Sequence, residues 1–232
     1  MNLLDRAPRP RLGVSLEAPM SRGITRRLPF GSDPVGWEGG RMTSRAEERD
    51  RRFPIFFNDN PIRRLLLPPR RLTRPFVARG QVAADIGCGP GFHALELAGL
   101  VGPTGRVYAV DADEEAIRAL RHKADDRGYR NIETHAASAT DLSFIADGSV
   151  DFVLAHGLLC SMAPQHHALA ASEIGRILKP RGLAYVSVAR GPWSYVGRAE
   201  WERILAGFSI EHRGDGFPWV AHRWAVVRRK RQ

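Results

Sequence analysis

Three glycines in five residues, directly after an apolar run, constrain this chain more than any other feature. The run 81–86 is followed by Gly87-Cys88-Gly89-Pro90-Gly91. Glycine populates positive φ and has no Cβ, so such a turn exposes bare backbone to a ligand and lets a helix begin close to the preceding strand. The pattern predicts a strand, a tight ligand-binding turn and a helix, although the glycines alone are also compatible with an ordinary tight turn.

A second apolar run, 106–110, ends in the carboxylate of Asp111. If the two runs are neighbouring strands of a parallel sheet, their C-terminal ends lie at one edge, which is where open α/β sheets bind ligands. An ionised carboxylate only accepts hydrogen bonds, and the diol of a ribose offers two donors to it. Together the two features predict a nucleoside-cofactor site.

Two common nucleotide-binding motifs are absent from this region. The nicotinamide dinucleotide fingerprint G-x-G-x-x-G requires glycine three positions after Gly89, where this chain has Phe92. The loop G-x-x-x-x-G-K-[ST] requires a Lys-Ser or Lys-Thr pair, and none follows these glycines. A nicotinamide-dependent oxidoreductase is therefore disfavoured and remains only an alternative.

The octad Asp85–Phe92, followed by Asp111, resembles the class I S-adenosylmethionine-dependent methyltransferases over about residues 81–189. In that family the glycine loop passes beside the methionine part of the cofactor, and the acid after the second strand binds the ribose hydroxyls. The resemblance implies S-adenosylmethionine as the cofactor. The residues that it assigns to cofactor binding are Asp85, Gly87, Cys88, Gly89, Gly91, Asp111, Ala112, Ser138, Ala139 and His156.

Two of these residues call for comment. The family usually shows an Asp-Ala pair beside the adenine, where this chain has Ser138-Ala139. A serine hydroxyl can donate or accept a hydrogen bond but carries no charge, so the adenine contact is left open. For Cys88, a small side chain that fits the loop is favoured over a reactive thiol.

His156 is the candidate catalytic residue. It ends the expected fourth strand, 151–156, and an imidazole titrates near neutral pH. A general base, a cofactor contact and a hydrogen-bonded strand-end histidine are all compatible with this position. Amino-methylating members of the family carry [N/D]-P-P-[Y/F/W] here, whereas this chain reads Ala155-His156-Gly157-Leu158, so methylation of base amines is disfavoured.

No metal site is predicted. Cys160, His166 and His167 lie close together in the sequence, but adjacent histidines on a helix point about 100° apart and cannot easily share an ion. We expect the two histidines at the start of a surface helix.

Strand and helix patterns alternate along the rest of the chain, which is typical of a doubly wound α/β fold. The predicted strands are 81–86, 106–110, 132–135, 151–156 and 183–189, with helices at 92–101, 113–128 and 165–178. A further helix, 198–207, precedes an antiparallel pair, 208–213 and 221–228. The expected fold is a mostly parallel, seven-stranded, Rossmann-like sheet with helices on both faces.

Positive charge is concentrated at the ends of the chain. Residues 1–79 contain 17 arginines against 8 acidic residues, whereas residues 80–227 have a net charge of −3. We expect a disordered basic tail at 1–42, with Met20 and Met42 as alternative starts, and a basic end at 229–232. Between them we expect a helical cap or lid at 43–79 and the methyltransferase domain at 80–228. The resemblance makes Phe56, Phe57 and Asn58 lid candidates.

The sequence therefore predicts a cytoplasmic S-adenosylmethionine-dependent methyltransferase with a small-molecule acceptor. No apolar run of about eighteen residues suggests a membrane span. The two cysteines, Cys88 and Cys160, do not indicate a disulfide framework. The alternatives are an RNA or protein methyltransferase that uses the basic ends, with nucleic acid the less favoured partner, and a nucleotide-binding module without activity. Neither the identity of the acceptor nor the oligomeric state is predicted.

Overall fold

The structure is a computed structural model, and it describes residues 70–190, 194–216 and 222–230. The predicted basic tail and most of the predicted lid segment, including Phe56, Phe57 and Asn58, lie outside these residues, as do the last two residues of the chain.

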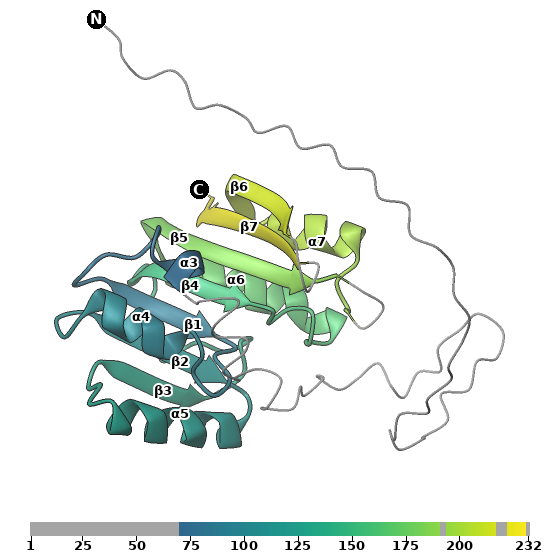
Figure 1. The fold of residues 1–232 in the computed structure, drawn as a ribbon. Helices are drawn as coiled ribbons and strands as arrows, with labels where there is room; N and C mark the ends of the chain where they lie inside the picture. The colour runs from purple at the N-terminus through teal and green to yellow at the C-terminus, as the bar shows by residue number, and fades with distance from the viewer. Residues whose placement is uncertain (1–69, 191–193, 217–221, 231–232) are drawn as a thin grey trace, which may run out of the picture. The chain divides into compact units, whose positions relative to one another are not determined.

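One sheet of seven strands organises the described domain, in the order β3-β2-β1-β4-β5-β7-β6 (Figure 1). The strands are β1 Val82–Ile86, β2 Arg106–Asp111, β3 Ile132–Ala136, β4 Val150–His156, β5 Leu178–Ala189, β6 Phe208–Gly216 and β7 His222–Arg229. The first five are mutually parallel, whereas β7 is antiparallel to β5 and β6 is antiparallel to β7. This confirms the predicted doubly wound, mostly parallel, seven-stranded fold.

Helices connect the parallel strands and flank the sheet. They are α3 Arg70–Thr73, α4 Ala94–Val101, α5 Glu114–Asp126, the 3-10 turn η1 Pro164–His166, α6 His167–Ile177 and α7 Arg198–Leu205. The start of α5 is fixed by Asp113, whose carboxylate accepts a hydrogen bond of 2.9 Å from the N–H of Glu115. Such an N-cap satisfies one of the donors that the first turn of a helix leaves without a partner.

The fifth strand begins earlier than the sequence pattern predicts. The sequence predicts a helix at 165–178 and a strand at 183–189, with residues 179–182 between them. In the structure Leu178 already pairs with Val150, and the register then shifts so that Leu183 pairs with Phe152. The intervening residues are accommodated as an irregularity within the strand, which is how a sheet absorbs extra residues without losing its pairing.

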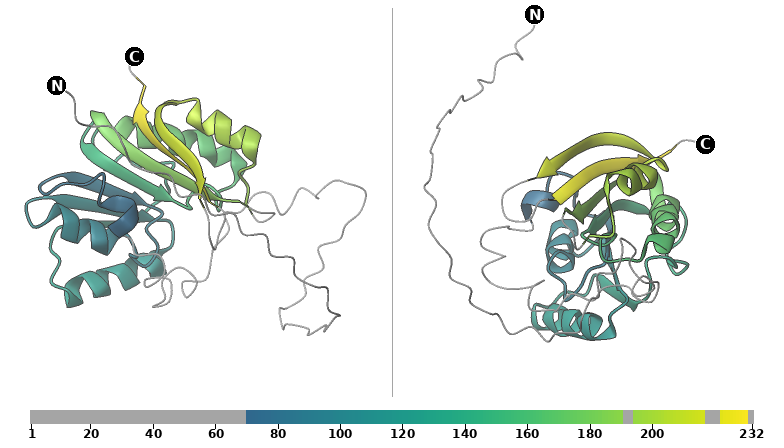
Figure 2. Two further views of the ribbon diagram at one scale, coloured as in Figure 1. Left: turned by 45° about the horizontal axis from the view of Figure 1, so that its top comes forward. Right: turned by 90° about the vertical axis from the view of Figure 1, so that its right-hand side faces the viewer.

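The two faces of the sheet bury different helices, as the side view in Figure 2 shows. On one face, Leu97 and Val101 of α4 pack with Phe152 of β4. On the other, Ile174 of α6 and Trp201 of α7 belong to the larger core. Helices therefore cover both faces, as expected for parallel strands joined by crossover helices.

Strand register brings the predicted site residues to one edge of the sheet. Asp85 of β1 lies opposite Leu154 of β4, and Ile86 lies opposite Val110 of β2. Because these strands are parallel, Asp85, Asp111 and His156 all fall at or near the C-terminal ends of adjacent strands. This is the edge at which open α/β sheets bind ligands.

Candidate cofactor and acceptor site

The three glycines of the loop after β1 have different surroundings. All three have positive φ, at 79° for Gly87, 51° for Gly89 and 90° for Gly91. A Cβ on Gly87 would lie 3.0 Å from the Leu158 side chain, and one on Gly91 would overlap Leu120 of α5. A Cβ on Gly89 would meet nothing within 4 Å. Packing therefore excludes a side chain at Gly91 and crowds one at Gly87, and Gly89 is the position at which a ligand has room to approach the backbone.

Asp111 is bonded to the glycine loop. The N–H of Gly89 donates to Asp111 Oδ2 at 2.7 Å, and the N–H of Asp113 donates to Oδ1 at 2.9 Å. Each carboxylate oxygen has two lone pairs, so both oxygens keep capacity to accept from a diol. Ala112, between the two acids, is exposed at this edge.

Asp85 is a buried carboxyl group with an unsatisfied oxygen. The residue is only 2% exposed, and the N–H of Ala94 donates to its carboxyl group. Its Oδ2 makes no hydrogen bond within the part of the chain that the structure describes. Burial, followed by the nearby charge of Asp111, raises the pKa of Asp85 to about 8. A buried polar atom without a partner is costly, and a cation placed against it would lower that cost.

Cys88 lies inside the loop without the environment of a nucleophile. It is 5% exposed, and its thiol contacts the carbonyl of Gly89 at 3.4 Å. Burial, reinforced by the charges of Asp85 and Asp111, raises the pKa of the thiol well above its usual range. Since the thiolate is the reactive form, this geometry agrees with the interpretation of Cys88 as a packing residue.

The segment after β3 begins beside Asp111. The N–H of Ala137 donates to the backbone carbonyl of Asp111 at 3.0 Å, and Ser138 follows directly. The exposed Ser138 hydroxyl lies 2.8 Å from the Thr140 hydroxyl and accepts from the Thr140 N–H at 3.2 Å. Ala139 is buried. The serine therefore closes a local turn in addition to any contact that it makes with a ligand.

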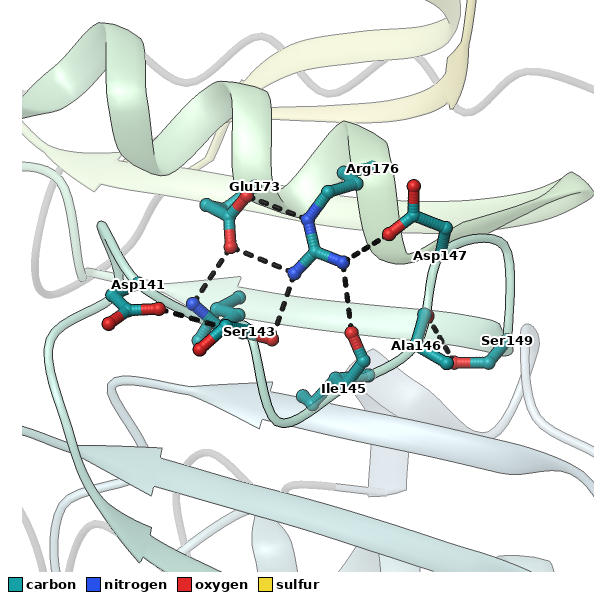
Figure 3. A network of polar contacts seen from close by, with 9 residues as sticks. Asp141, Ser143, Ile145, Ala146, Asp147, Ser149, Glu173 and Arg176 are labelled. Carbon is teal, nitrogen blue, oxygen red and sulfur yellow. Dashed lines mark hydrogen bonds and ion pairs between the residues drawn. The ribbon is translucent and has the colours of Figure 1, made fainter.

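Arg176 of α6 holds the next part of this segment in place (Figure 3). Its guanidinium donates to the carbonyls of Leu142 and Ile145 at 2.8 and 2.9 Å, and to the carboxylate of Asp147. It also pairs with both oxygens of Glu173, at 2.7 and 2.9 Å. Glu173 in turn accepts from the Leu142 N–H at 2.8 Å, and hydrogen bonding to Arg176 lowers the pKa of its carboxyl group.

The sequence reasoning did not identify this network. The sequence predicts a helix at 165–178 but assigns no contact to Glu173 or Arg176. The available signal was the i, i+3 spacing of Glu173 and Arg176, which places an acid and a base on the same face of a helix.

His156 is the centre of a group of imidazoles. Its Nδ1 lies 2.7 Å from the hydroxyl oxygen of Ser187, which is fully buried on β5. Its ring centroid lies 5.1 Å from that of His93, which approaches edge-on, and 5.0 Å from that of His222, whose ring is nearly parallel at 13°. The sequence does not predict Ser187 and His222 here, because only the pairing of β5 with β4 and of β7 with β5 brings them to the end of β4.

Described residues provide no metal centre. Within 70–190, 194–216 and 222–230, no group of three or more histidine, cysteine, aspartate or glutamate side chains could hold an ion. The surface position predicted for His167 is wrong, because its side chain is fully buried. Its Nε2 donates to the Leu159 carbonyl at 2.9 Å, and its Nδ1 lies 3.0 Å from Glu200 Oε1. His167 therefore ties the segment after β4 to α7.

Membrane-spanning helices are also not found in the described part of the chain, where no helix has the length and apolarity needed.

Known proteins share this domain. Residues 83–182 match a family model described as a methyltransferase domain. The chain is 31% identical over 112 residues to demethylmenaquinone methyltransferase of Geobacillus stearothermophilus. These 112 residues make up 48% of this chain and 47% of that protein. It is 35% identical over 98 residues to nocamycin O-methyltransferase of Saccharothrix syringae, covering 42% of this chain and 34% of that protein. The chain thus spans less than half the length of these curated relatives.

A solved methyltransferase structure has a similar fold. The crystal structure of a SAM-dependent methyltransferase from Aquifex aeolicus superimposes with a TM-score of 0.63 and 24% identity, over 75% of this chain and 96% of that one. The glycine loop and the acid at the end of β2 lie within residues 83–182, which the family model matches. Residues 83–182 thus match the methyltransferase-domain family model, and the described domain has the fold of a solved SAM-dependent methyltransferase.

Proposed function

We propose that this protein transfers the methyl group of S-adenosylmethionine to a small-molecule acceptor. The observation that carries the proposal is the buried Asp85, which lies beside the open backbone at Gly89 and the ribose-type acid Asp111. S-adenosylmethionine has an α-ammonium group and a sulfonium centre, so it supplies the cation that the unsatisfied Oδ2 of Asp85 lacks. Its ribose diol matches the remaining acceptor capacity of Asp111.

The cofactor supplies an activated methyl group, and the protein supplies binding and orientation. In this proposal Asp85 and the backbone around Gly89 hold the methionine end, and Asp111 holds the ribose. Ala112, Ser138 and Ala139 lie towards the adenine, on a segment that Arg176 anchors. His156 ends the neighbouring strand and faces the methyl acceptor. The remaining predicted contacts, Gly87, Cys88 and Gly91, shape the loop.

The small-molecule acceptor is inferred from two relatives. Demethylmenaquinone methyltransferase and nocamycin O-methyltransferase are both named for small-molecule substrates. A location in the cytoplasm forms part of the same proposal. The basic ends, which would favour RNA or protein as the acceptor, lie mostly outside the described residues.

Titration calorimetry with S-adenosylhomocysteine tests the cofactor. We expect binding by the wild-type protein, and Asp111→Ala should weaken it by about 1–3 kcal/mol because ribose hydroxyls lose their acceptor. A folded wild-type protein that gives no binding would contradict the proposal. The acceptor class is tested with methyl-labelled S-adenosylmethionine and a cell extract separated into small-molecule and macromolecular fractions. We expect label in the small-molecule fraction, and label only in RNA or protein would assign the acceptor to that class.

A further inference from the structure

We propose that the methyl acceptor carries a carboxylate or a phosphate group, and that an arginine-lined cavity between α7 and the β6–β7 pair binds this group. The inference rests on the proposed function and adds the chemical class of the acceptor. None of the residues that line the cavity belongs to the candidate cofactor site.

The cavity has a volume of about 330 Å³. Small-molecule sites range from about 300 to 1,000 Å³, so this one suits a single small group better than a segment of a macromolecule. Figure 1 shows α7 beside the β6–β7 pair. The lining residues come from α7, β6 and β7 in turn and are Arg198, Trp201, Glu202, Arg213, Gly214, Asp215, Arg223 and Trp224.

Positive charge exceeds negative charge in this cavity. Three of the lining side chains are arginines and two are acids. One of the acids also serves an arginine outside the lining, because Asp215 Oδ1 pairs with Arg223 Nε at 3.2 Å while its Oδ2 lies 3.7 Å from Arg190. The excess is local, since residues 80–227 together have a net charge of −3. An anion placed here would balance it.

The arginines also have unused hydrogen-bond donors. A guanidinium group has five N–H donors. Arg213 contacts Glu202 through Nη1 alone, at 3.3 Å, and Arg223 contacts Asp215 through Nε alone. Arg198 makes no hydrogen bond or ion pair among the described residues. Carboxylates and phosphates are the groups that accept paired N–H bonds from guanidinium groups, so they match these free donors.

Packing fixes the walls of the cavity. Trp201 is only 1% exposed and belongs to the larger core, and the Trp224 ring lies so close to Gly214 that a Cβ there would come within 2.9 Å of it. The side chain of Arg223 is 19% exposed, so its charge is partly removed from water. A cation in this position is costly unless an anion compensates it, and walls that are already in place reduce the cost of binding one.

The cavity lies near the edge of the sheet where the cofactor is proposed to bind. Arg223 is the second residue of β7, and the first, His222, pairs with Ala189 at the end of β5. The end of β5 in turn pairs with the end of β4. Neighbouring strands are about 4.8 Å apart, which places β7 roughly 10 Å from β4. A small acceptor of that length can hold its anionic group in the cavity while its reacting atom lies near the end of β4.

The first test measures the charge of the product. Full-length protein is incubated with methyl-labelled S-adenosylmethionine and the small-molecule fraction of a cell extract, and the labelled product is applied to an anion-exchange column at neutral pH. We expect the column to retain the label, because carboxylates and phosphates are ionised there. Alkaline phosphatase then distinguishes the two groups, since loss of retention indicates a phosphate monoester and unchanged retention indicates a carboxylate.

The second test asks whether the cavity binds the anionic group. Arg198→Glu reverses a charge that has no partner among the described residues, so the fold should not depend on it. Arg213→Gln removes a second guanidinium group. Arg127→Gln, at an exposed arginine that ends α5, is the matched control. Transfer rates measured against dilutions of the small-molecule fraction give relative values of KM and kcat.

We expect each of the two cavity variants to raise KM on the order of 10-fold, which corresponds to the loss of a charge-assisted hydrogen bond. The change in kcat should be small, because a contact away from the reacting atom contributes equally before and during the transfer. The affinity for S-adenosylhomocysteine should stay at the wild-type value. Arg127→Gln should change none of these quantities.

Other outcomes overturn the inference in distinguishable ways. If wild type binds S-adenosylhomocysteine and labels a small molecule that the column does not retain, the acceptor is uncharged and only this inference fails. If the product is retained but both cavity variants keep the wild-type KM, the anionic group binds elsewhere. If wild type binds no cofactor product, or labels no small molecule, the proposed function itself fails and this inference fails with it.

Discussion

The backbone N–H of Gly89 donates a 2.7 Å hydrogen bond to Oδ2 of Asp111, which joins the turn after β1 to the end of β2. The two parts of the candidate cofactor site are therefore linked directly and do not depend on a ligand to bring them together. A loop that is already held in its binding geometry loses less conformational freedom when a ligand arrives.

Substituting alanine at two glycines should separate stability from binding. Gly91→Ala places a Cβ against Leu120 at a φ of 90°, so we expect a loss of about 2–4 kcal/mol in the free energy of unfolding. Gly89→Ala meets open space at a φ of 51° and should cost only about 1–2 kcal/mol.

For ligand affinity the two variants should rank in the opposite order, with Gly89→Ala losing more than Gly91→Ala. We expect Gly89→Ala to weaken S-adenosylhomocysteine binding by roughly 10-fold or more, about 1.4 kcal/mol, because its methyl group occupies the approach to the backbone. Chemical denaturation and calorimetry measure the two quantities. Equal binding by wild type and Gly89→Ala would show that the ligand does not pass over this residue.

The raised pKa of Asp85 predicts a pH dependence of stability. In the folded, ligand-free protein the group keeps its proton up to a pH of about 8, whereas an ordinary aspartate loses it near 3.8. Between these values the folded state binds more protons than the unfolded state, so this group lowers stability as the pH rises. Asp85→Asn should therefore gain stability relative to wild type from about pH 5 to pH 8. A difference that is constant with pH would contradict the assignment.

The affinity for S-adenosylhomocysteine should rise with pH, whereas the contribution of Asp85 to stability falls. A ligand ammonium group favours the ionised form of Asp85, so below a pH of about 8 binding must also remove the proton. We expect the affinity of wild type for S-adenosylhomocysteine to rise with pH and to level off near that value. Asp85→Asn should bind more weakly at the upper end and should show little slope. Asp126→Asn, at an exposed carboxylate of α5, should behave as wild type.

Removal of Arg176 should destabilise the protein and make the segment after β3 more mobile. Arg176→Met removes the partner of two buried carbonyls and of Glu173, and we expect a loss of about 2–4 kcal/mol in stability. Hydrogen exchange should quicken at 141–147. Arg118→Met, which breaks an exposed i, i+4 pair with Glu114, should cost no more than a few tenths of a kcal/mol. Unchanged exchange in Arg176→Met would show that the segment is held by other contacts.

His167→Phe should destabilise the protein without altering a surface. The ring is fully buried and bonds to the Leu159 carbonyl and to Glu200, so a phenylalanine of similar size removes the donor to that carbonyl and leaves Glu200 with its ion pair to Arg203. We expect a loss of about 2–4 kcal/mol in chemical denaturation. His122→Phe, on the exposed side of α5, is the control and should stay close to wild type. A neutral effect at His167 would mean that its polar contacts contribute little.

The fold was predictable because its determinants are local and repeated. Apolar runs of strand length alternate with helical segments, and the turn at Gly87–Gly91 has backbone angles that favour glycine. The early start of β5 was not predictable, because Pro180 and Gly182 are typical of a turn and only pairing with Val150 makes the segment part of a strand.

The arrangement of the candidate site was predictable only where it lies next to a motif. Asp85, Gly89 and Asp111 follow directly from strand ends and glycine spacing. The surroundings of His156 did not, since Ser187 and His222 reach it through pairing between β4, β5 and β7, and this pairing has no short-range signature. His167 was misplaced because a pair of histidines at a helix start is usually solvated, whereas here Glu200 of a distant helix satisfies one of them.

The two helical layers that cover the sheet support different parts of the candidate site. The layer that contains α4 and α5 shapes the glycine loop, while α6, on the opposite face, fixes the segment that follows Ser138 and Ala139. The two ends of one elongated ligand would thus be held from opposite sides of the same sheet. Substitutions in α6 would then change recognition of the nucleobase and leave binding of the amino acid end unchanged. The two parts of the candidate site can therefore vary independently, in evolution or by design.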